Sequence, residues 1–125
     1  MIEVKRIHPR EGETLHAALL RQNIIKEIDG TLLLNSHHSY YYQIQLQLFC
    51  TQRKWADFVA SDGENLFVTN TPYNKEFMER NLPRLKHFYY NVLLLELAYP
   101  RVKEGADRIG KLGIDYSILC NNRQE

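Results

Sequence analysis

Residues 38–60, HSYYYQIQLQLFCTQRKWADFVA, decide how this chain folds. They hold three consecutive tyrosines, three glutamines at every second position, a basic pair and a short aromatic-aliphatic run. The closing run, Trp55–Ala60, is rich in residues that favour strands. The segment before it, 40–51, alternates polar and apolar residues, and this periodicity alone fits either a helix or a strand. Three amide side chains so close together are not explained by solubility, so we take them as a candidate functional surface.

A helix over Tyr40–Thr51 would place Gln43 and Gln47 one turn apart on one face and would turn Gln45 elsewhere. We expect this helix to lay one or more glutamines over an acid and a lysine at the start of the chain. A glutamine amide cannot transfer protons, but it can hydrogen-bond a metal-bound water or a phosphate. The alternative is an ordinary polar helix face.

Residues 1–7, MIEVKRI, alternate apolar and charged side chains as a strand does. One face would carry Ile2 and Val4, with Ile7 as a further candidate, and the other Glu3 and Lys5. A carboxylate beside an ammonium group suits metal-assisted phosphodiester hydrolysis, in which the acid binds Mg²⁺ and the lysine orients water. The same spacing is common on solvated strand faces, so the pair alone leaves both interpretations open.

The remaining patterns predict further elements on both sides of this stretch. They are a helix over Thr14–Asp29, an extended piece over Thr31–Leu34, a hairpin of Trp55–Ala60 and Asn65–Thr71 around Asp62-Gly63, and a helix over Asn74–Leu97. Pro83 should kink or break the last helix. Its core-facing residues should be Phe77, Leu85, Phe88, Tyr89, Val92 and Leu95. Residues 102–125 form a polar segment that we expect to be a weakly ordered tail, although GIDYSIL could pair as an edge strand.

Composition narrows the class of protein. The 125 residues are 44% hydrophobic and 25% charged, which fits one packed domain. A net charge of +1 disfavours a protein that coats DNA but leaves room for a local basic patch. Two cysteines without a CxxC spacing suit a reducing compartment. We find no secretory signal and no apolar run long enough for a membrane span, and so expect an intracellular protein, nuclear in a eukaryote and otherwise cytoplasmic.

Other side chains have a functional and a structural interpretation. Tyr40 could stack on an unpaired base, whereas Tyr41 is expected in the core. Arg53 and Lys54 could contact phosphate or could belong to a solvated turn. Trp55 is expected in the core. The five histidines show no zinc-binding spacing.

These residues resemble the YqaJ-like viral recombinase domain, a lambda-exonuclease-type member of the PD-(D/E)XK nucleases. The run HSYYYQIQLQL followed by RKWADFV is similar to the family pattern HPYYYQVQGQL followed by GRKWCDFVVW. IEVK resembles the family's EIKCP strand, and FMERNLPRLKHFYYNVLLLELAYPR its closing helix. The resemblance covers residues 2–101, in the same order and with the same spacing. We therefore expect a nuclease core over 1–101, followed by the polar tail.

The resemblance implies a restriction-endonuclease-like α/β (α+β) fold, a mixed sheet flanked by helices. It also implies an Mg²⁺-dependent exonuclease that degrades one strand of linear DNA from an end in recombination and repair. Carried over by position, Glu3 would be the metal-binding acid, Lys5 the catalytic lysine, and Gln43 the helix glutamine, with Gln45 next in line. DNA contacts would come from Arg53, Lys54 and Tyr40.

Departures from the family pattern change the expected activity. Family members carry a metal-binding Asp on the strand before the EIK motif, and no counterpart precedes Glu3 here. One carboxylate holds Mg²⁺ poorly, because this ion usually recruits more than one anionic oxygen. We therefore expect an N-terminally truncated domain that is weakly active or inactive alone, through a missing N-terminal portion or the need for a homo-oligomer. The alternative is a non-catalytic DNA-binding module derived from the same fold.

Overall fold

A computed structural model of the chain describes residues 1–98 and Gly105. They belong to two compact units, Met1–Met78 and the part from Glu79 onward, and each is described by itself. The expected core 1–101 thus comprises the first unit and the described start of the second. Apart from Gly105, the expected tail 102–125 with its GIDYSIL segment lies outside the described residues.

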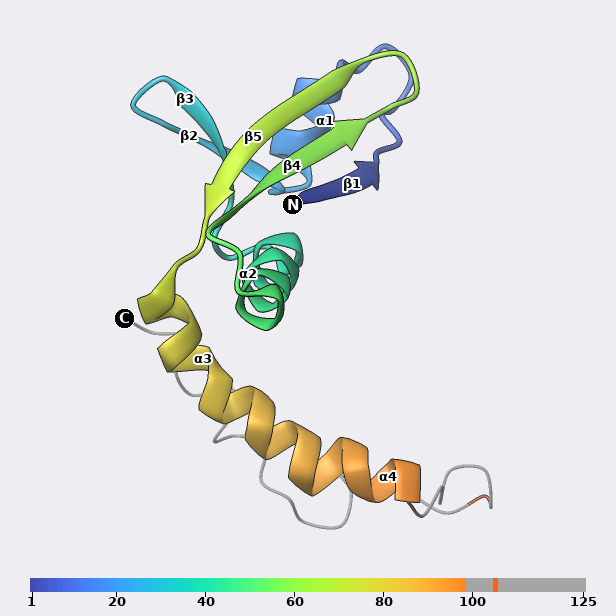
Figure 1. Cartoon of the computed structure of the whole chain (residues 1–125). Helices are drawn as coiled ribbons and strands as arrows, with labels where there is room; N and C mark the ends of the chain where they lie inside the picture. The colour runs from blue at the N-terminus through green and yellow to red at the C-terminus, as the bar shows by residue number, and fades with distance from the viewer. Residues whose placement is uncertain (99–104, 106–125) are drawn as a thin grey trace. The chain divides into compact units, whose positions relative to one another are not determined.

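The first unit is built on a mixed three-stranded sheet in the order β1-β4-β5 (Figure 1). Its strands are β1 (Ile2–Arg6), β4 (Trp55–Ser61) and β5 (Leu66–Pro72). β1 pairs parallel with β4, which pairs antiparallel with β5 across the turn that contains Gly63. The strands predicted over residues 1–7, Trp55–Ala60 and Asn65–Thr71 are therefore confirmed, and the fold is mixed α/β with a mixed sheet.

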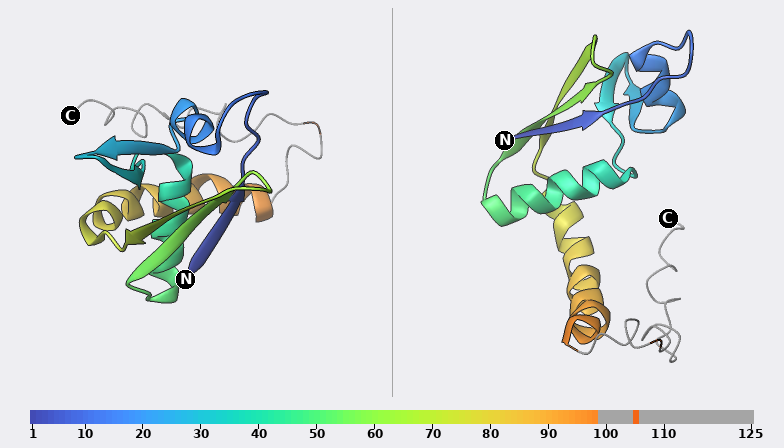
Figure 2. Two further views of the ribbon diagram at one scale, coloured as in Figure 1. Left: turned by 90° about the horizontal axis from the view of Figure 1, so that it is seen from above. Right: turned by 90° about the vertical axis from the view of Figure 1, so that its right-hand side faces the viewer.

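Helix α2 (Ser39–Thr51) is the last element of the long connection from β1 to its parallel neighbour β4, and it lies on one face of the sheet (Figure 2). Two parallel strands need such a crossover, because a tight turn can join only antiparallel strands. The tyrosine-glutamine segment is therefore helical. Its N-cap is His38, whose Nδ1 accepts a hydrogen bond from the Tyr40 N–H at 3.2 Å.

The predicted helix over Thr14–Asp29 is wrong in its second half. Helix α1 (Leu15–Arg21) begins at the N-cap Thr14 and ends early, and the chain then forms strand β2 (Ile25–Ile28). β2 pairs antiparallel with β3 (Thr31–Leu34) around Asp29 and Gly30, with φ of 50° and 76°. Two successive residues with positive φ match a hairpin turn whose twist suits the flanking strands.

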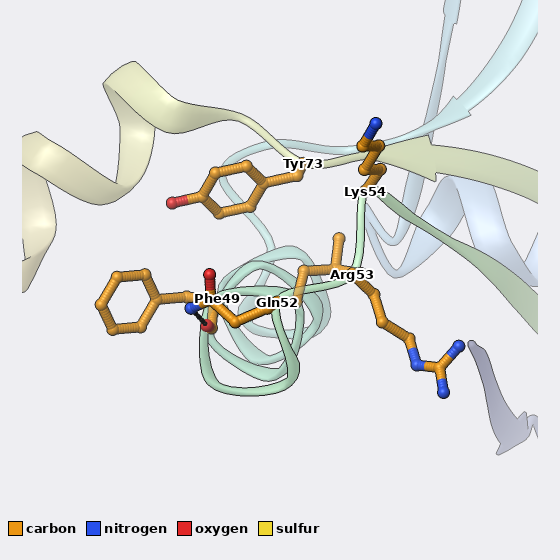
Figure 3. A pocket seen from close by; sticks show the side chains of 6 residues that line it. Phe49, Gln52, Arg53, Lys54 and Tyr73 are labelled. Carbon is orange, nitrogen blue, oxygen red and sulfur yellow. Dashed lines mark hydrogen bonds between the residues drawn. The ribbon is translucent and has the colours of Figure 1, made fainter.

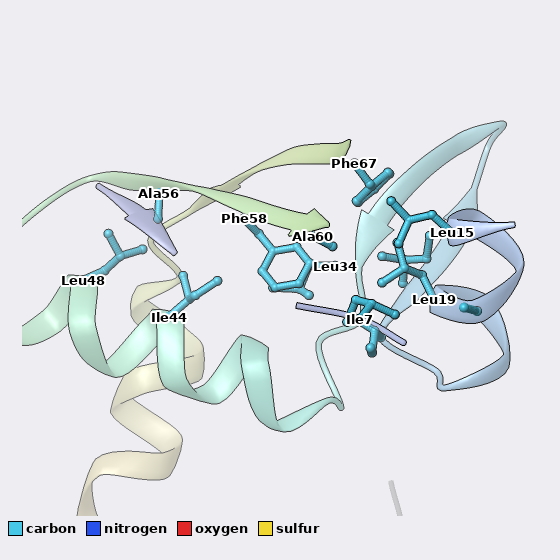
Figure 4. Packing of buried hydrophobic residues seen from close by; sticks show 13 residues of the cluster. Ile7, Leu15, Leu19, Leu34, Ile44, Leu48, Ala56, Phe58, Ala60 and Phe67 are labelled. Carbon is cyan, nitrogen blue, oxygen red and sulfur yellow. The ribbon is translucent and has the colours of Figure 1, made fainter. Parts of the chain in front are cut away.

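The core lies between the inner face of the sheet, α2, α1 and the β2–β3 hairpin (Figure 4). Its largest fully buried apolar side chains are Phe58, Leu19, Ile24, Ile44, Leu48 and Met78. Ile7 is also buried, so it does not share the face of Ile2 and Val4, which are exposed. The outer face also exposes Trp55, whose side chain is 50% exposed, so the expectation of a core tryptophan was wrong.

The long C-terminal helix runs through Pro83 without a break. Helix α3 (Lys75–Phe88) contains this proline, and a π-helical stretch (Tyr89–Leu93) and α4 (Leu94–Ala98) continue it. The missing N–H of a proline removes a single backbone hydrogen bond, and the irregular turn follows later in the helix.

Burial along this helix differs from the expectation. Phe77 is buried as predicted, against the rings of Tyr41 and Tyr42. The other residues expected to face the core, Leu85, Phe88, Tyr89, Val92 and Leu95, are exposed or half-buried. No helix in the described part of the chain is both long and apolar enough to cross a membrane.

Candidate active site

Glu3 and Lys5 lie on the inner face of β1, the side on which α2 packs. The parallel register places them beside Phe58 and Ala60 of β4, and both of these neighbours are buried. Their side chains are 17% and 22% exposed, and Lys5 Nζ lies 2.8 Å from Glu3 Oε1. The charged pair is therefore a half-buried ion pair at the margin of the core, and the interpretation as a freely solvated strand face does not hold.

Helix α2 adds two glutamine amides to this pair, as expected from the spacing of four residues. Gln43 contacts both charges, because its Nε2 donates to Glu3 Oε1 at 3.0 Å and its Oε1 accepts from Lys5 Nζ at 2.9 Å. Gln47 donates from Nε2 to Glu3 Oε2 at 3.1 Å. Its Oε1 is buried and has no hydrogen-bond partner among the described residues.

These contacts fix the charge state of the acid. The hydrogen bond from Lys5 does most to lower the pKa of Glu3 below its ordinary value. Burial, the second-largest effect, raises this pKa, and the hydrogen bonds from Gln47 and Gln43 lower it further. Lys5 Nζ also lies over the Tyr40 ring, 4.8 Å from its centroid, in a cation–π contact that stabilises the ammonium group. Glu3 is thus held as a carboxylate at neutral pH, within a hydrogen-bonded cluster of Glu3, Lys5, Gln43 and Gln47.

Tyr40 is part of the packing rather than an exposed platform. Its half-buried ring lies 5.9 Å from the ring of Phe58 and 4.6 Å from that of His38. Tyr41 packs against the core as expected.

Gln45 does not join the cluster. Its side chain is fully buried on another face of α2, where Nε2 donates to Pro72 O at 2.9 Å and Oε1 accepts from Asn74 N at 2.7 Å. The amide therefore fastens α2 to the junction between β5 and α3. Gln47 is instead the second glutamine that contacts the charged pair. The resemblance did not single out Gln47, but its spacing of one helical turn from Gln43 predicted that the two share a face.

Arg53 and Lys54 lie after α2, at a separate pocket of about 320 Å³ lined also by Leu48, Phe49, Gln52 and Tyr73. The rings of Phe49 and Tyr73 lie on one side, whereas the Arg53 and Lys54 side chains extend away from them (Figure 3). Both basic residues are exposed. The structure thus does not bring them into the Glu3–Lys5 cluster, and they form a basic rim beside an aromatic pocket.

The cluster by itself does not fit an Mg²⁺ cage. It offers one carboxylate, both of whose oxygens already accept hydrogen bonds, and one unpaired amide oxygen from Gln47. Nowhere in the described residues do three or more histidine, cysteine, aspartate or glutamate side chains gather closely enough to hold a metal. Because Mg²⁺ requires octahedral oxygen coordination, these residues hold at most part of such a site.

Lys5 directs two of the three donors of its ammonium group to Glu3 and Gln43, and the group also lies over the Tyr40 ring. Searches of protein-family models, curated proteins and solved structures found no match to this chain.

Proposed function

We propose that this chain is a restriction-endonuclease-like scaffold for phosphodiester hydrolysis on linear DNA, of the YqaJ-like type. The observation that carries the proposal is the joint contact of Gln43 with both Glu3 and Lys5, from a helix that connects two parallel strands. In this assignment Glu3 is a metal-binding acid, Lys5 orients the attacking water and offsets charge on phosphorus, and Gln43 holds the two in register.

We propose further that the chain alone has little or no nuclease activity. Support comes from the single carboxylate of the cluster, since Mg²⁺ would find only Glu3 as an anionic ligand there. A working centre needs further anionic oxygen, supplied by additional chain or by a partner.

Incubation of the purified protein with end-labelled linear double-stranded DNA and Mg²⁺ tests this proposal. The expected result is the same negligible digestion for the wild type and for Lys5→Ala. Lys86→Ala serves as a matched control, because it removes an exposed lysine outside both the cluster and the basic rim. Robust digestion by the wild type that Lys5→Ala abolishes and Lys86→Ala retains would contradict the argument from the missing acid.

A second candidate is a DNA-binding module without chemistry, and the basic rim of Arg53 and Lys54 beside the rings of Phe49 and Tyr73 favours it. Basic groups hold phosphates and exposed rings stack on unpaired bases. Gel shifts with Mg²⁺ and with chelator separate the two candidates. A pure binder keeps its affinity in chelator and loses it in the Arg53→Ala/Lys54→Ala variant. Absence of any shift at low salt would indicate an interaction domain unrelated to DNA.

A further inference from the structure

Strand β1 has one open edge in the described part of the chain. It is the terminal strand of the sheet, and among residues 1–98 it pairs only with β4 (Figure 1). The bonds from Asp57 N to Met1 O and from Ile7 N to Ser61 O show that odd-numbered residues direct their backbone groups toward β4. In a parallel ladder the alternate residues point the other way, so Ile2, Val4 and Arg6 present their N–H and C=O groups at the open edge.

The sequence of this edge is complementary to itself. When a second copy pairs antiparallel with Val4 opposite Val4, Ile2 meets Arg6 of the other copy, and each of these facing pairs can exchange two N–H···O bonds. In the same register Glu3 lies opposite Lys5 on the inner face. Opposite charges therefore meet twice across the two-fold axis, which is favourable for cross-strand pairs.

Neighbouring registers are less favourable. A shift by two residues in one direction places Glu3 opposite Glu3, and a shift in the other direction places Lys5 opposite Lys5, which brings like charges together. A shift by one residue would place the inner-face side chains of one copy beside the outer-face side chains of the other. It would also set the open-edge N–H and C=O groups of one strand opposite residues whose backbone groups point away. Of these registers, the one with Val4 opposite Val4 pairs the backbone N–H and C=O groups, brings opposite charges together and keeps each side chain on its own face of the sheet.

The outer face of the sheet supports the same arrangement. Val4, Val59 and Val68 form one row across the three strands, and Val4 and Val68 are 61% and 58% exposed. Antiparallel pairing of two β1 strands would continue this row into the second copy, so that apolar side chains beside the new contact shield each other from water.

We propose that two copies of this chain associate through their β1 strands and join their sheets into one continuous sheet. The contact covers one five-residue strand from each copy. Such an interface is smaller than those of permanent dimers, so the association is weak and depends on protein concentration. The proposal is independent of nuclease activity and goes beyond it.

Sedimentation velocity over a series of protein concentrations tests the interface. The wild type should shift from monomer toward dimer as concentration rises, and Val4→Lys should remain a monomer because it places two ammonium groups opposite each other at the axis. Val68→Lys is the matched control, since Val68 has nearly the same exposure on the same face but lies on β5. It should associate like the wild type.

Crosslinking tests the register. In a background with Cys50→Ser and Cys120→Ser, Val4→Cys should give an oxidised or bismaleimide-linked dimer, because facing Cα atoms of such a pair lie about 5.5 Å apart, within disulfide range. Val68→Cys should not, because its two copies would be five strand spacings, roughly 24 Å, apart.

These experiments have two results that would overturn the proposal. The first is a wild type that stays monomeric at all concentrations and a Val4→Cys variant that forms no crosslinked dimer; the open edge of β1 would then be available to a strand of another protein. The second is association that survives Val4→Lys, or equal linking through Val68→Cys.

Discussion

Gln45 shows how much one buried amide can contribute to this fold. Both ends of its side chain are bonded to backbone groups, at Pro72 O and Asn74 N, in a fully buried position. Gln45→Leu keeps the size of the side chain but leaves two backbone groups unpaired. We expect a loss of about 2–4 kcal/mol in the free energy of unfolding, measured by urea denaturation. Gln22→Leu, at an exposed position, should change it by less than about 0.5 kcal/mol. Equal stability of the two variants would exclude this structural role.

Glu3 offers a test of the charged cluster that does not depend on activity. Lys5→Met removes the largest cause of the lowered pKa, so the pKa of Glu3 should rise toward the ordinary value of 4.5. An NMR titration of the side-chain carboxyl carbon measures this. Glu13, whose separate ion pair with Arg21 lowers its pKa to about 2, is the internal control and should not move.

The sign of the pH dependence follows from the same shift. A carboxyl with a lowered pKa in the folded state contributes stability above its unfolded pKa, and this contribution disappears as pH falls through the folded pKa. The wild type should therefore lose more stability than Lys5→Met between pH 6 and strongly acidic pH. An unchanged Glu3 titration in Lys5→Met would show that the ion pair does not set the charge state.

The glutamines also show what a sequence can reveal at the scale of single residues. Helical spacing puts Gln43 and Gln47 on one face, and both contact Glu3. The resemblance placed Gln45 in the site, yet its direction on the helix turns it to the β5–α3 junction. Helical spacing therefore predicted that Gln43 and Gln47 act together. It could not predict the partners of Gln45, because these depend on the path of the chain between β5 and α3.

At the scale of elements, the N-terminus of α2 is sensitive to pH. His38 Nδ1 accepts from the Tyr40 N–H and must be unprotonated to do so, and burial lowers the pKa of His38 below 6.5. Because the folded state favours neutral histidine, the cap contributes stability above pH 6.5 and loses it as pH falls through the lowered pKa. A cap contributes about 1 kcal/mol.

His38→Ser should keep the cap and remove most of this pH dependence, because a hydroxyl oxygen accepts the same bond without titrating here. Thermal unfolding at pH 7.5 and pH 5 measures the difference. His37→Ser is the neighbouring control, since the His37 side chain is exposed and does not cap the helix. A wild-type pH response retained in His38→Ser would place its origin elsewhere.

Elements with a clear local signal were predictable, and those that depend on tertiary packing were not. Alternation predicted β1, strand-favouring residues predicted β4, and the turn at Asp62-Gly63 predicted its partner β5. The apolar residues Ile24, Ile25 and Ile28 fitted a helical stripe, but Asn23 adopts a φ of 54° and the next residues pair with β3 instead. β-branched residues such as these isoleucines favour strands, and pairing with β3 across the turn stabilises the strand instead of the helix.

At the scale of the molecule, the buried residues of the described part of the chain gather in the first unit. Every residue of the main core cluster lies between Ile7 and Phe67, and the last buried residue in the described part of the chain is Met78. Beyond it the helix exposes apolar side chains such as Phe88 and Leu97. Among the described residues, the hydrophobic burial that offsets chain entropy is therefore concentrated in the first unit.

A fragment of residues 1–84, which keeps nearly three turns of α3, should therefore fold alone. We expect cooperative urea unfolding with a midpoint close to that of the whole chain, and a smaller slope with denaturant only in proportion to the surface removed. A fragment of residues 1–62 is the control, because it lacks β5 and with it Phe67, Thr69 and Thr71, all of them buried. It should be unfolded. If 1–84 were unfolded as well, the residues after Met78 would be required for folding, and the core described for the first unit would be insufficient to hold it together.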